Sequence, residues 1–114
     1  MLFDEGDIFY TPLFKIVWSE TPSKTLSPAQ VVFSVSKRSF SKAVDRNLLK
    51  RRMREAYRRD KHIVYDLLNS LNKQIAFIVI FRGSHIPDYQ EIEKSMADMI
   101  VRLCKTIREK QKNC

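Results

Sequence analysis

The sequence predicts an α+β protein, a small two-layer sandwich in which helices cover a mixed sheet. The chain has 114 residues, the size of one ordinary domain, and we expect residues 1–114 to form a single domain. Its 44% hydrophobic and 30% charged residues are a globular composition. Strand-like patterns occur early and late in the chain, with helical periodicity between and after them. This order of elements predicts the two layers.

Two strands are expected in the first third of the chain. Residues 8–18 are rich in aromatic and β-branched types and predict one strand, with Pro12 at its start or on an edge. Residues 20–30 contain two prolines and several hydroxyl side chains and predict a loop. Residues 31–36 set an apolar face against small hydroxyls, which predicts a second strand, antiparallel to the first.

The rest of the chain predicts two helices and one further strand. A long helix is expected from residue 41 to about residue 61, and residues 63–71 either continue it or bend away. The unbroken apolar run 75–81 predicts a strand that is buried on both faces. A last amphipathic helix is expected to pack on the sheet through Tyr89, Ile92, Met96, Met99, Ile100, Leu103 and Ile107.

The positive charge is concentrated in one segment. The formal net charge is +8, and residues 37–61 alone hold eleven Lys and Arg against three Asp and Glu. The rest of the chain is neutral. A solvated helix face is the alternative, but the pairs 51–52 and 58–59 place arginines side by side, without the sign alternation that stabilises such faces. The pattern therefore favours a binding site for a polyanion.

Membrane and export roles are not indicated. The longest apolar run, residues 75–81, has the length of a strand and is far too short to span a bilayer. Residues 1–5 are acidic where a secretory signal would be basic, so we expect a cytoplasmic protein. The two cysteines, Cys104 and Cys114, are both interpreted as thiols.

The basic helix has two distinct sides. At about 100° per residue, Leu49, Met53, Ala56 and Tyr57 share one arc, which we expect to pack on the sheet. Arginine is the main residue of the neighbouring arc, and its planar fork suits phosphates and bases. Asn47 either reads a base edge or ribose hydroxyl, or is an ordinary surface amide. This arc holds Arg46, Asn47, Lys50, Arg51, Arg54 and Arg58.

A strand, a turn and this helix follow one another in a specific pattern. The strand and turn read FSVSKR over residues 33–38, and the helix reads KAVDRNLLKRRMRE over residues 42–55. The chain resembles the bacterial ribonuclease P protein component in this spacing. The resemblance extends more weakly to residues 3–6 and to residues 77–80 with the helix that follows, so it covers most of the chain.

The resemblance implies the protein subunit of an RNA-based endonuclease that removes the 5′ leader from precursor tRNA. Catalysis would belong to the RNA subunit and its magnesium ions, with no cofactor or metal bound by the protein alone. The implied partners are the ribonuclease P RNA and the precursor tRNA leader, with no membrane and no DNA. The predicted RNA-contacting residues are Lys37, Arg38, Arg46, Asn47, Lys50, Arg51, Arg54 and, from the helix geometry, Arg58.

The resemblance also implies that the single-stranded leader lies in a cleft between the sheet and the basic helix. Such clefts combine basic groups with aromatic platforms. Phe3, Phe14 and Trp18 are the candidate platforms, although ordinary core packing is the alternative for each ring. Ser34 and Ser36 are candidates for the floor, because their small side chains would admit a backbone or a base.

Two expectations about the fold come from the same resemblance. It implies a left-handed β-α-β crossover through the basic helix, against the usual right-handed rule. It also implies an N-terminal helix, of which this sequence would hold only the end. The chain departs from the family pattern at Leu48, where many members have a basic residue, and at residues 39–41, where many have a glycine-containing turn.

No protein active site is expected. The sequence has no cluster of carboxylates for two metals, and His62 and His85 are interpreted as surface residues. One rival function is a generic basic RNA- or ribosome-binding module, which shares the charge but not the motif spacing. The other is a DNA-reading helix, which is disfavoured because the basic helix follows a strand and a turn.

Overall fold

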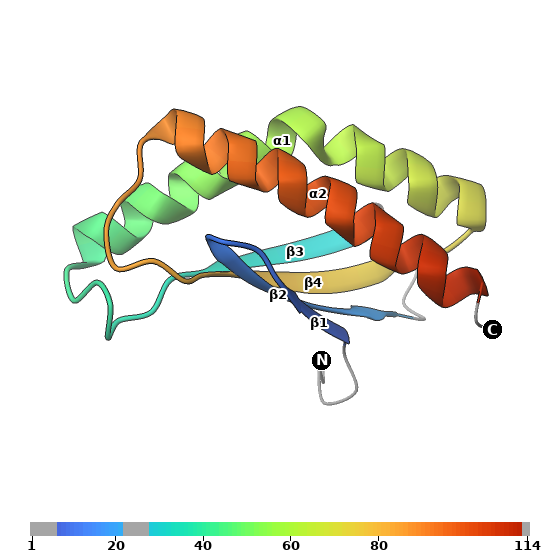
Figure 1. The fold of residues 1–114 in the computed structure, drawn as a ribbon, viewed down its shortest axis with the longest axis horizontal. Coiled ribbons are helices and arrows are strands. Elements are labelled where there is room, and N and C mark those ends of the chain that lie inside the picture. Colours follow the sequence, from blue (N-terminus) through green and yellow to red (C-terminus); the bar gives the residue numbers. More distant parts are fainter. Residues whose placement is uncertain (1–6, 22–27, 113–114) are drawn as a thin grey trace.

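The computed structural model describes residues 7–21 and 28–112. Both helices cover one face of a four-stranded sheet, so the predicted two-layer α+β sandwich is confirmed (Figure 1). Residues 1–6 lie outside the described part, and with them the predicted end of an N-terminal helix. The elements are β1 (Asp7–Tyr10), β2 (Phe14–Glu20), β3 (Ala29–Ser34), α1 (Ala43–Leu71), β4 (Ile75–Phe81) and α2 (Tyr89–Lys112).

The sheet is mixed, with the strand order β1-β2-β4-β3. β2 is antiparallel to both β1 and β4, whereas β3 runs parallel to β4. β3 therefore runs antiparallel to β2, the main part of the first predicted strand, as the sequence predicts, but β4 lies between the two strands and they do not pair. The long helix after β3 returns the chain to the end of the sheet where β3 begins, so β4 runs parallel to β3.

The single strand predicted over residues 8–18 is in fact the hairpin β1-β2. The turn between its strands closes through Thr11, whose N–H donates to the Phe14 carbonyl oxygen at 2.8 Å. The Phe14 N–H in turn donates to the Thr11 hydroxyl oxygen at 3.1 Å. Pro12 lies within this turn, where its fixed φ fits and no ladder hydrogen bond is lost. The strand-forming residues on both sides conceal the turn in the sequence.

Helix α1 is continuous for 29 residues, so residues 63–71 continue the basic helix rather than bend away. It contains no glycine or proline, and it ends at Asn72, which adopts the left-handed conformation with φ of 54°. The predicted packing face is confirmed, because Leu49, Met53, Ala56 and Tyr57 are all buried.

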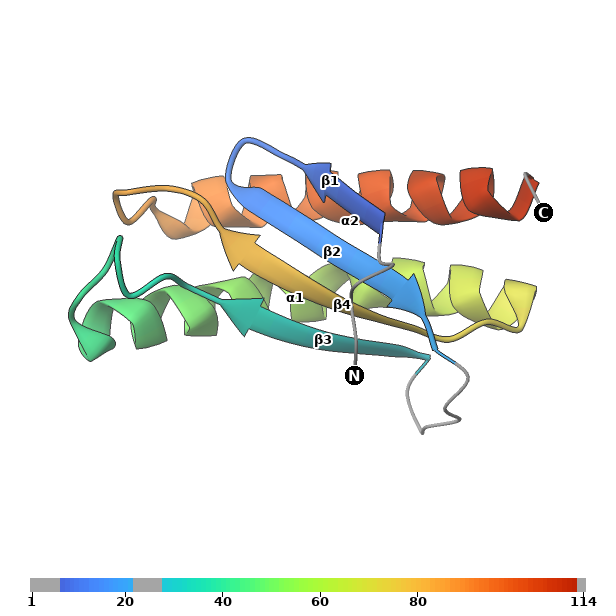
Figure 2. The same cartoon turned by 90° about the horizontal axis from the view of Figure 1, so that it is seen from below.

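The connection from β3 through α1 to β4 is left-handed, as the resemblance implies. In Figure 2 the sheet lies in front of the helices, and β3 runs toward the left. Helix α1 carries the chain back behind the sheet, and β4 then runs to the left on the side of β3 nearer to β2. About 98% of such crossovers in proteins turn the other way.

The core lies between the sheet and the helices. Phe14, Ile16 and Trp18 alternate along β2 toward the helices, and all three are 0% exposed. Ile78 and Ile80 of β4 alternate to the opposite face and are only half-buried. The prediction that β4 is buried on both faces is thus wrong for these two residues, because both helices lie on one side. We call the side opposite the helices the open face.

Candidate RNA-binding site

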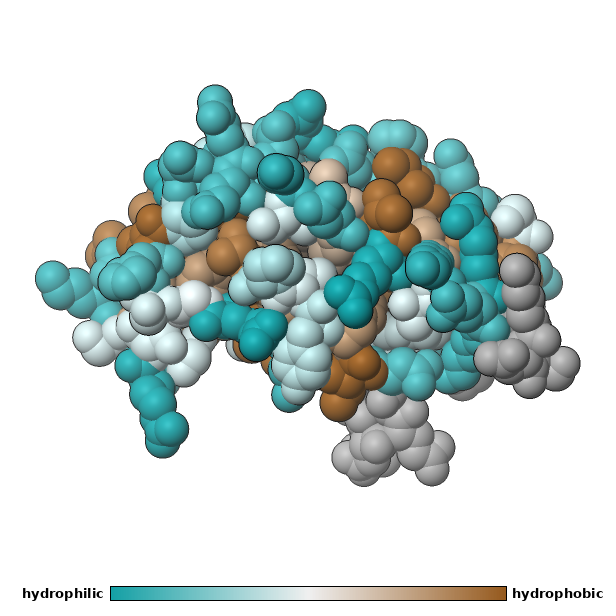
Figure 3. Space-filling model, in the orientation of Figure 1, coloured by the Kyte–Doolittle hydropathy of each residue, from teal (hydrophilic) through white to brown (hydrophobic). Residues whose placement is uncertain are grey.

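The cations predicted to contact RNA lie along the outer side of α1. Asn47, Arg51, Arg54 and Arg58 are exposed, and Lys50 is half-buried beside them. We call these five residues the α1 basic face. The helix orientation that the sequence predicts from its core arc therefore holds for this face. In Figure 3 the outer surfaces of α1 and α2 are mostly hydrophilic, with isolated hydrophobic patches.

The turn between β3 and α1 extends this surface. Lys37 and Arg38 are both exposed in it, and the Arg38 N–H donates to the Ser36 hydroxyl oxygen at 3.1 Å. Phe40 fixes the turn because its ring is buried, with its centre 5.8 Å from that of Phe81. None of residues 37–41 has a positive φ, which explains why this turn forms without glycine.

Arg46 has a structural role that the sequence did not predict. Its Nη1 donates to the carbonyl oxygens of Phe40 at 2.8 Å and of Ser41 at 3.0 Å. The side chain is half-buried and ties the first turns of α1 to the preceding loop. Arg46 therefore holds the loop that carries Lys37 and Arg38, in addition to any contact with RNA.

The adjacent arginine pairs divide between two sides of α1. Arg51 and Arg58 belong to the α1 basic face, whereas their neighbours point toward α2. Arg52 donates through Nη1 to the Pro87 carbonyl oxygen at 3.0 Å. Arg59 forms an ion pair with Glu93, which raises the pKa of its guanidinium. Arg52 thus joins α1 to the loop before α2 and Arg59 joins α1 to α2, so the like charges of each pair diverge.

Two of the predicted leader contacts are wrong. Phe14 and Trp18 are 0% exposed and point toward the helices, so no RNA base can stack on them. Their alternation with Ile16 places all three on the covered face of β2, which is the core-packing alternative. Phe3 lies outside the described residues. Ser34 alternates with Phe33 and therefore lies on the open face, and Ser36 is exposed in the turn that follows β3.

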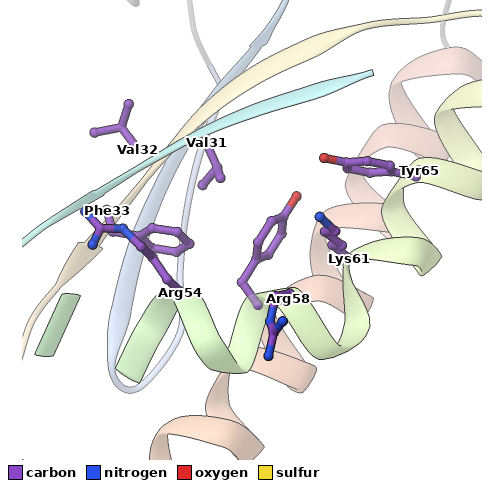
Figure 4. A pocket seen from close by; sticks show the side chains of 8 residues that line it. Val31, Val32, Phe33, Arg54, Arg58, Lys61 and Tyr65 are labelled. Carbon is purple, nitrogen blue, oxygen red and sulfur yellow. The ribbon is translucent and has the colours of Figure 1, made fainter. Parts of the chain in front are cut away.

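Core side chains fill most of the space between the sheet and α1. The Tyr57 ring centre lies 5.8 Å from that of Phe33 and 5.9 Å from that of Phe77. At the outer edge of β3, the described residues leave a groove of about 470 Å³ beside the helix (Figure 4). We call it the β3–α1 groove; it is lined by Val31, Val32, Phe33, Arg54, Tyr57, Arg58, Lys61 and Tyr65.

The open face carries an aromatic platform that the sequence reasoning missed. Tyr10 is 49% exposed, and the Arg82 guanidinium carbon lies 4.8 Å from its ring centre. The Lys15 Nζ lies 6.0 Å from the same centre. Exposed Ile8 and Val32 widen this surface, and both helices lie behind it in Figure 2. The burial of Phe9 between exposed Ile8 and Tyr10 is the alternation that could have located the platform.

Comparison with known proteins identifies the family. The sequence model of the family described as Ribonuclease P matches residues 1–104 of this chain. The chain belongs to the ribonuclease P protein family. It is 32% identical over 104 residues to the ribonuclease P protein component of Porphyromonas gingivalis W83, covering 90% of this chain and 74% of that protein. It is 33% identical over 109 residues to that of Chlorobium phaeobacteroides, covering 87% and 75%.

Solved structures of ribonuclease P proteins share the fold. The protein from Thermotoga maritima superposes with a TM-score of 0.69 at 23% identity, covering 88% of this chain and 86% of that one. The protein from Staphylococcus aureus gives a TM-score of 0.66 at 22% identity, covering 90% and 84%. The fold implied by the resemblance is therefore the fold of this family.

Membership in the ribonuclease P protein family makes this chain the protein component of an RNA-based endoribonuclease. Within the described residues, no three His, Cys, Asp or Glu side chains are grouped closely enough to hold a metal ion. His62 and His85 are both exposed, as the sequence predicts. Neither described helix has a stretch apolar enough to cross a bilayer.

Proposed function

We propose that this protein binds a ribonuclease P RNA through the α1 basic face and the β3–α1 turn, and so supports 5′ maturation of tRNA. The observation that carries the proposal is the exposure of Arg51, Arg54 and Arg58 on one side of a helix whose other side is buried in the core. Arginine forks bind phosphates in a bidentate manner, and each neutralised phosphate releases counterions. The rigid helix holds these groups at fixed spacing along the RNA backbone.

The chemistry of cleavage belongs to the RNA subunit in this proposal. Magnesium ions bound by that RNA would supply the Lewis acid and the activated water. The cations of the α1 basic face would lower the repulsion between RNA phosphates and so favour retention of those ions at low magnesium. We also propose the cytoplasm as the compartment, because tRNA precursors are made there in bacteria.

We further propose that the open face binds the single-stranded leader of the precursor tRNA. Tyr10 offers a ring for stacking, and Lys15 and Arg82 flank it with positive charge. Stacking of one base on an aromatic ring contributes about 1–3 kcal/mol to binding. Ser34, which the sequence assigns to the leader cleft, lies on the same face. The open face and the α1 basic face lie on opposite layers, so the two RNAs can bind together.

The test is cleavage of a precursor tRNA by a bacterial ribonuclease P RNA at low magnesium, with and without this protein. We expect cleavage at the correct site only when the protein is present. A variant with Lys50→Ala, Arg51→Ala and Arg54→Ala should lose this stimulation. A matched variant with Lys94→Ala, Lys105→Ala and Arg108→Ala, which removes three exposed cations from α2, should retain it.

A generic RNA- or ribosome-binding module is the rival function. Such a module would bind the ribonuclease P RNA tightly but would not stimulate cleavage, and its affinity for tRNA precursors would not depend on the leader. Equal loss of RNA binding in the two triple variants would also favour the rival, since it would mean that total charge rather than the α1 basic face determines binding.

A further inference from the structure

The β3–α1 groove has an aromatic floor and a basic rim. Along α1, residues 54, 58, 61 and 65 follow the i, i+4, i+7, i+11 spacing that places side chains in one row. In Figure 4, Arg54 lies at the Phe33 end of the groove and Tyr65 at the opposite end. The volume of about 470 Å³ falls in the range of small-ligand sites, which runs from about 300 to 1,000 Å³.

The floor contains an unpartnered polar group. Tyr57 is 5% exposed and lines the groove, and its hydroxyl has no hydrogen-bond partner among the described residues. Burial raises the pKa of this phenol, so it stays protonated and can donate. Leaving such a hydroxyl unsatisfied is unfavourable, and a ligand with a matching acceptor would satisfy it.

The rim supplies positive charge and a second ring. Arg54 and Arg58 are exposed, and none of the lining residues is acidic. Arg58 pairs with Glu55 at 2.6 Å, but both side chains are more than half exposed, so a phosphate can compete for the guanidinium. The Lys61 Nζ lies 5.6 Å from the ring centre of Tyr65, which places a cation beside a stacking surface.

We propose that the β3–α1 groove binds one unpaired nucleotide of the RNA that docks on the α1 basic face. The base enters between β3 and α1 against the floor of Phe33 and Tyr57, and the Tyr57 hydroxyl donates to an acceptor on the base. The phosphate lies on the rim formed by Arg58 and Lys61. The inference rests on the proposed function and adds to it a position where the RNA must present an unstacked base.

An acidic peptide that adds a strand to the edge of β3 is the other occupant the geometry admits. Strand addition is driven by main-chain hydrogen bonds along the whole edge. It would use neither the Tyr57 hydroxyl nor the Tyr65 ring. The nucleotide accounts for the cations, for both tyrosines and for the buried hydroxyl, and is therefore the occupant we test first.

The first experiment measures binding of each variant to a bacterial ribonuclease P RNA without any tRNA. Tyr65→Leu keeps an apolar side chain but removes the ring, and it should weaken binding about tenfold, within the range for one stacked base. Tyr57→Phe should weaken it severalfold while the melting temperature stays the same or rises, since the lost hydroxyl has no partner. Tyr89→Phe on α2 is the matched control and should bind like the wild type.

The second experiment titrates the labelled protein with adenosine monophosphate, ribose 5-phosphate and an extended glutamate peptide, followed by NMR. The nucleotide should shift the Val31 methyl and Tyr57 ring signals, whereas ribose 5-phosphate should shift only the signals of the rim. Peptide-induced shifts along the β3 amides, with none from the nucleotide, would overturn the proposal in favour of strand addition.

The same variants distinguish a failure of the groove proposal from a failure of the proposed function. If Tyr57→Phe and Tyr65→Leu both bind the RNA like the wild type, while the Lys50, Arg51 and Arg54 triple variant binds poorly, the groove proposal is wrong and the proposed function stands. If the triple variant also binds like the wild type, the RNA does not dock on α1 and both are wrong.

Discussion

Arg46 and Arg51 have the same side chain on the same helix, yet their surroundings differ. Arg46 donates to two carbonyl oxygens of the preceding loop, whereas Arg51 is exposed on the α1 basic face. Hydrogen bonds from charged groups contribute more to stability than neutral ones, about 1.5–3 kcal/mol. The motif spacing alone assigns both residues to RNA, and only the structure separates their roles.

The two alanine variants should therefore behave differently. Arg46→Ala should lower the free energy of unfolding by about 1–3 kcal/mol and also weaken RNA binding, because the loop with Lys37 and Arg38 loses its anchor. Arg51→Ala should leave the stability within about 0.5 kcal/mol and lower the salt dependence of RNA binding by about one phosphate equivalent. Urea unfolding and binding at several salt concentrations measure both effects. Equal stability of the two variants would contradict the anchoring role.

The face of a helix or strand that each side chain occupies decides which site residues can be predicted from sequence. The cations of the α1 basic face lie on the side that the sequence predicts, because a helix with a clear apolar arc has one outer side. The sequence does not predict the faces occupied by Phe14, Trp18 and Tyr10. The turn at Pro12 interrupts the alternation of residues 8–18, and aromatic rings occur on both faces of the hairpin. Which face of the hairpin each ring occupies depends on the pairing of β2 with β4.

Helix α1 has one buried side and one basic side. Leu49, Met53, Val64 and Leu68 are 0% exposed and join the helix to the core, while the opposite side carries the basic face. The sequence does not settle whether this helix is continuous. Residues 61–63 contain no helix breaker, which permits continuation, but they also lack the strong apolar periodicity that would predict it. Its end is clearer, since Asn72 readily adopts the left-handed conformation.

Truncation of the buried side of α1 should destabilise the whole protein. Met53→Ala should lower the free energy of unfolding by about 2–5 kcal/mol, because it opens a cavity between helix and sheet. His62→Ala, on the exposed side of the same helix, should change stability by less than about 0.5 kcal/mol and leave cleavage unaffected. Calorimetric melting of both variants provides the measurement. A Met53→Ala variant that melts like the wild type would mean that the helix is packed differently.

The left-handed crossover determines where the α1 basic face lies relative to the edge of β3. It places α1 behind β3 and β4, so the α1 basic face and the edge of β3 lie close together and form the groove. General rules of chain geometry predict the opposite hand. The strand order was equally inaccessible, because the pairing of β2 and β3 with β4 spans a long stretch of sequence.

The proposed function requires the protein to bind two RNAs on separate surfaces, the ribonuclease P RNA on α1 and the leader on the open face. Tyr10→Ala tests it, because this ring is the main platform of the open face and lies in the layer opposite α1. The reconstituted holoenzyme is compared for its affinity toward a precursor tRNA and toward the mature tRNA. Val101→Ala, an exposed position on α2 outside both surfaces, serves as the control.

Tyr10→Ala should lower the preference for precursor over mature tRNA about tenfold, the contribution of one stacked base. The affinity of the protein for the ribonuclease P RNA should stay unchanged. A preference equal to that of the wild type, or a loss of RNA-subunit binding as large as that of the Lys50, Arg51 and Arg54 triple variant, would contradict the separation of the two surfaces.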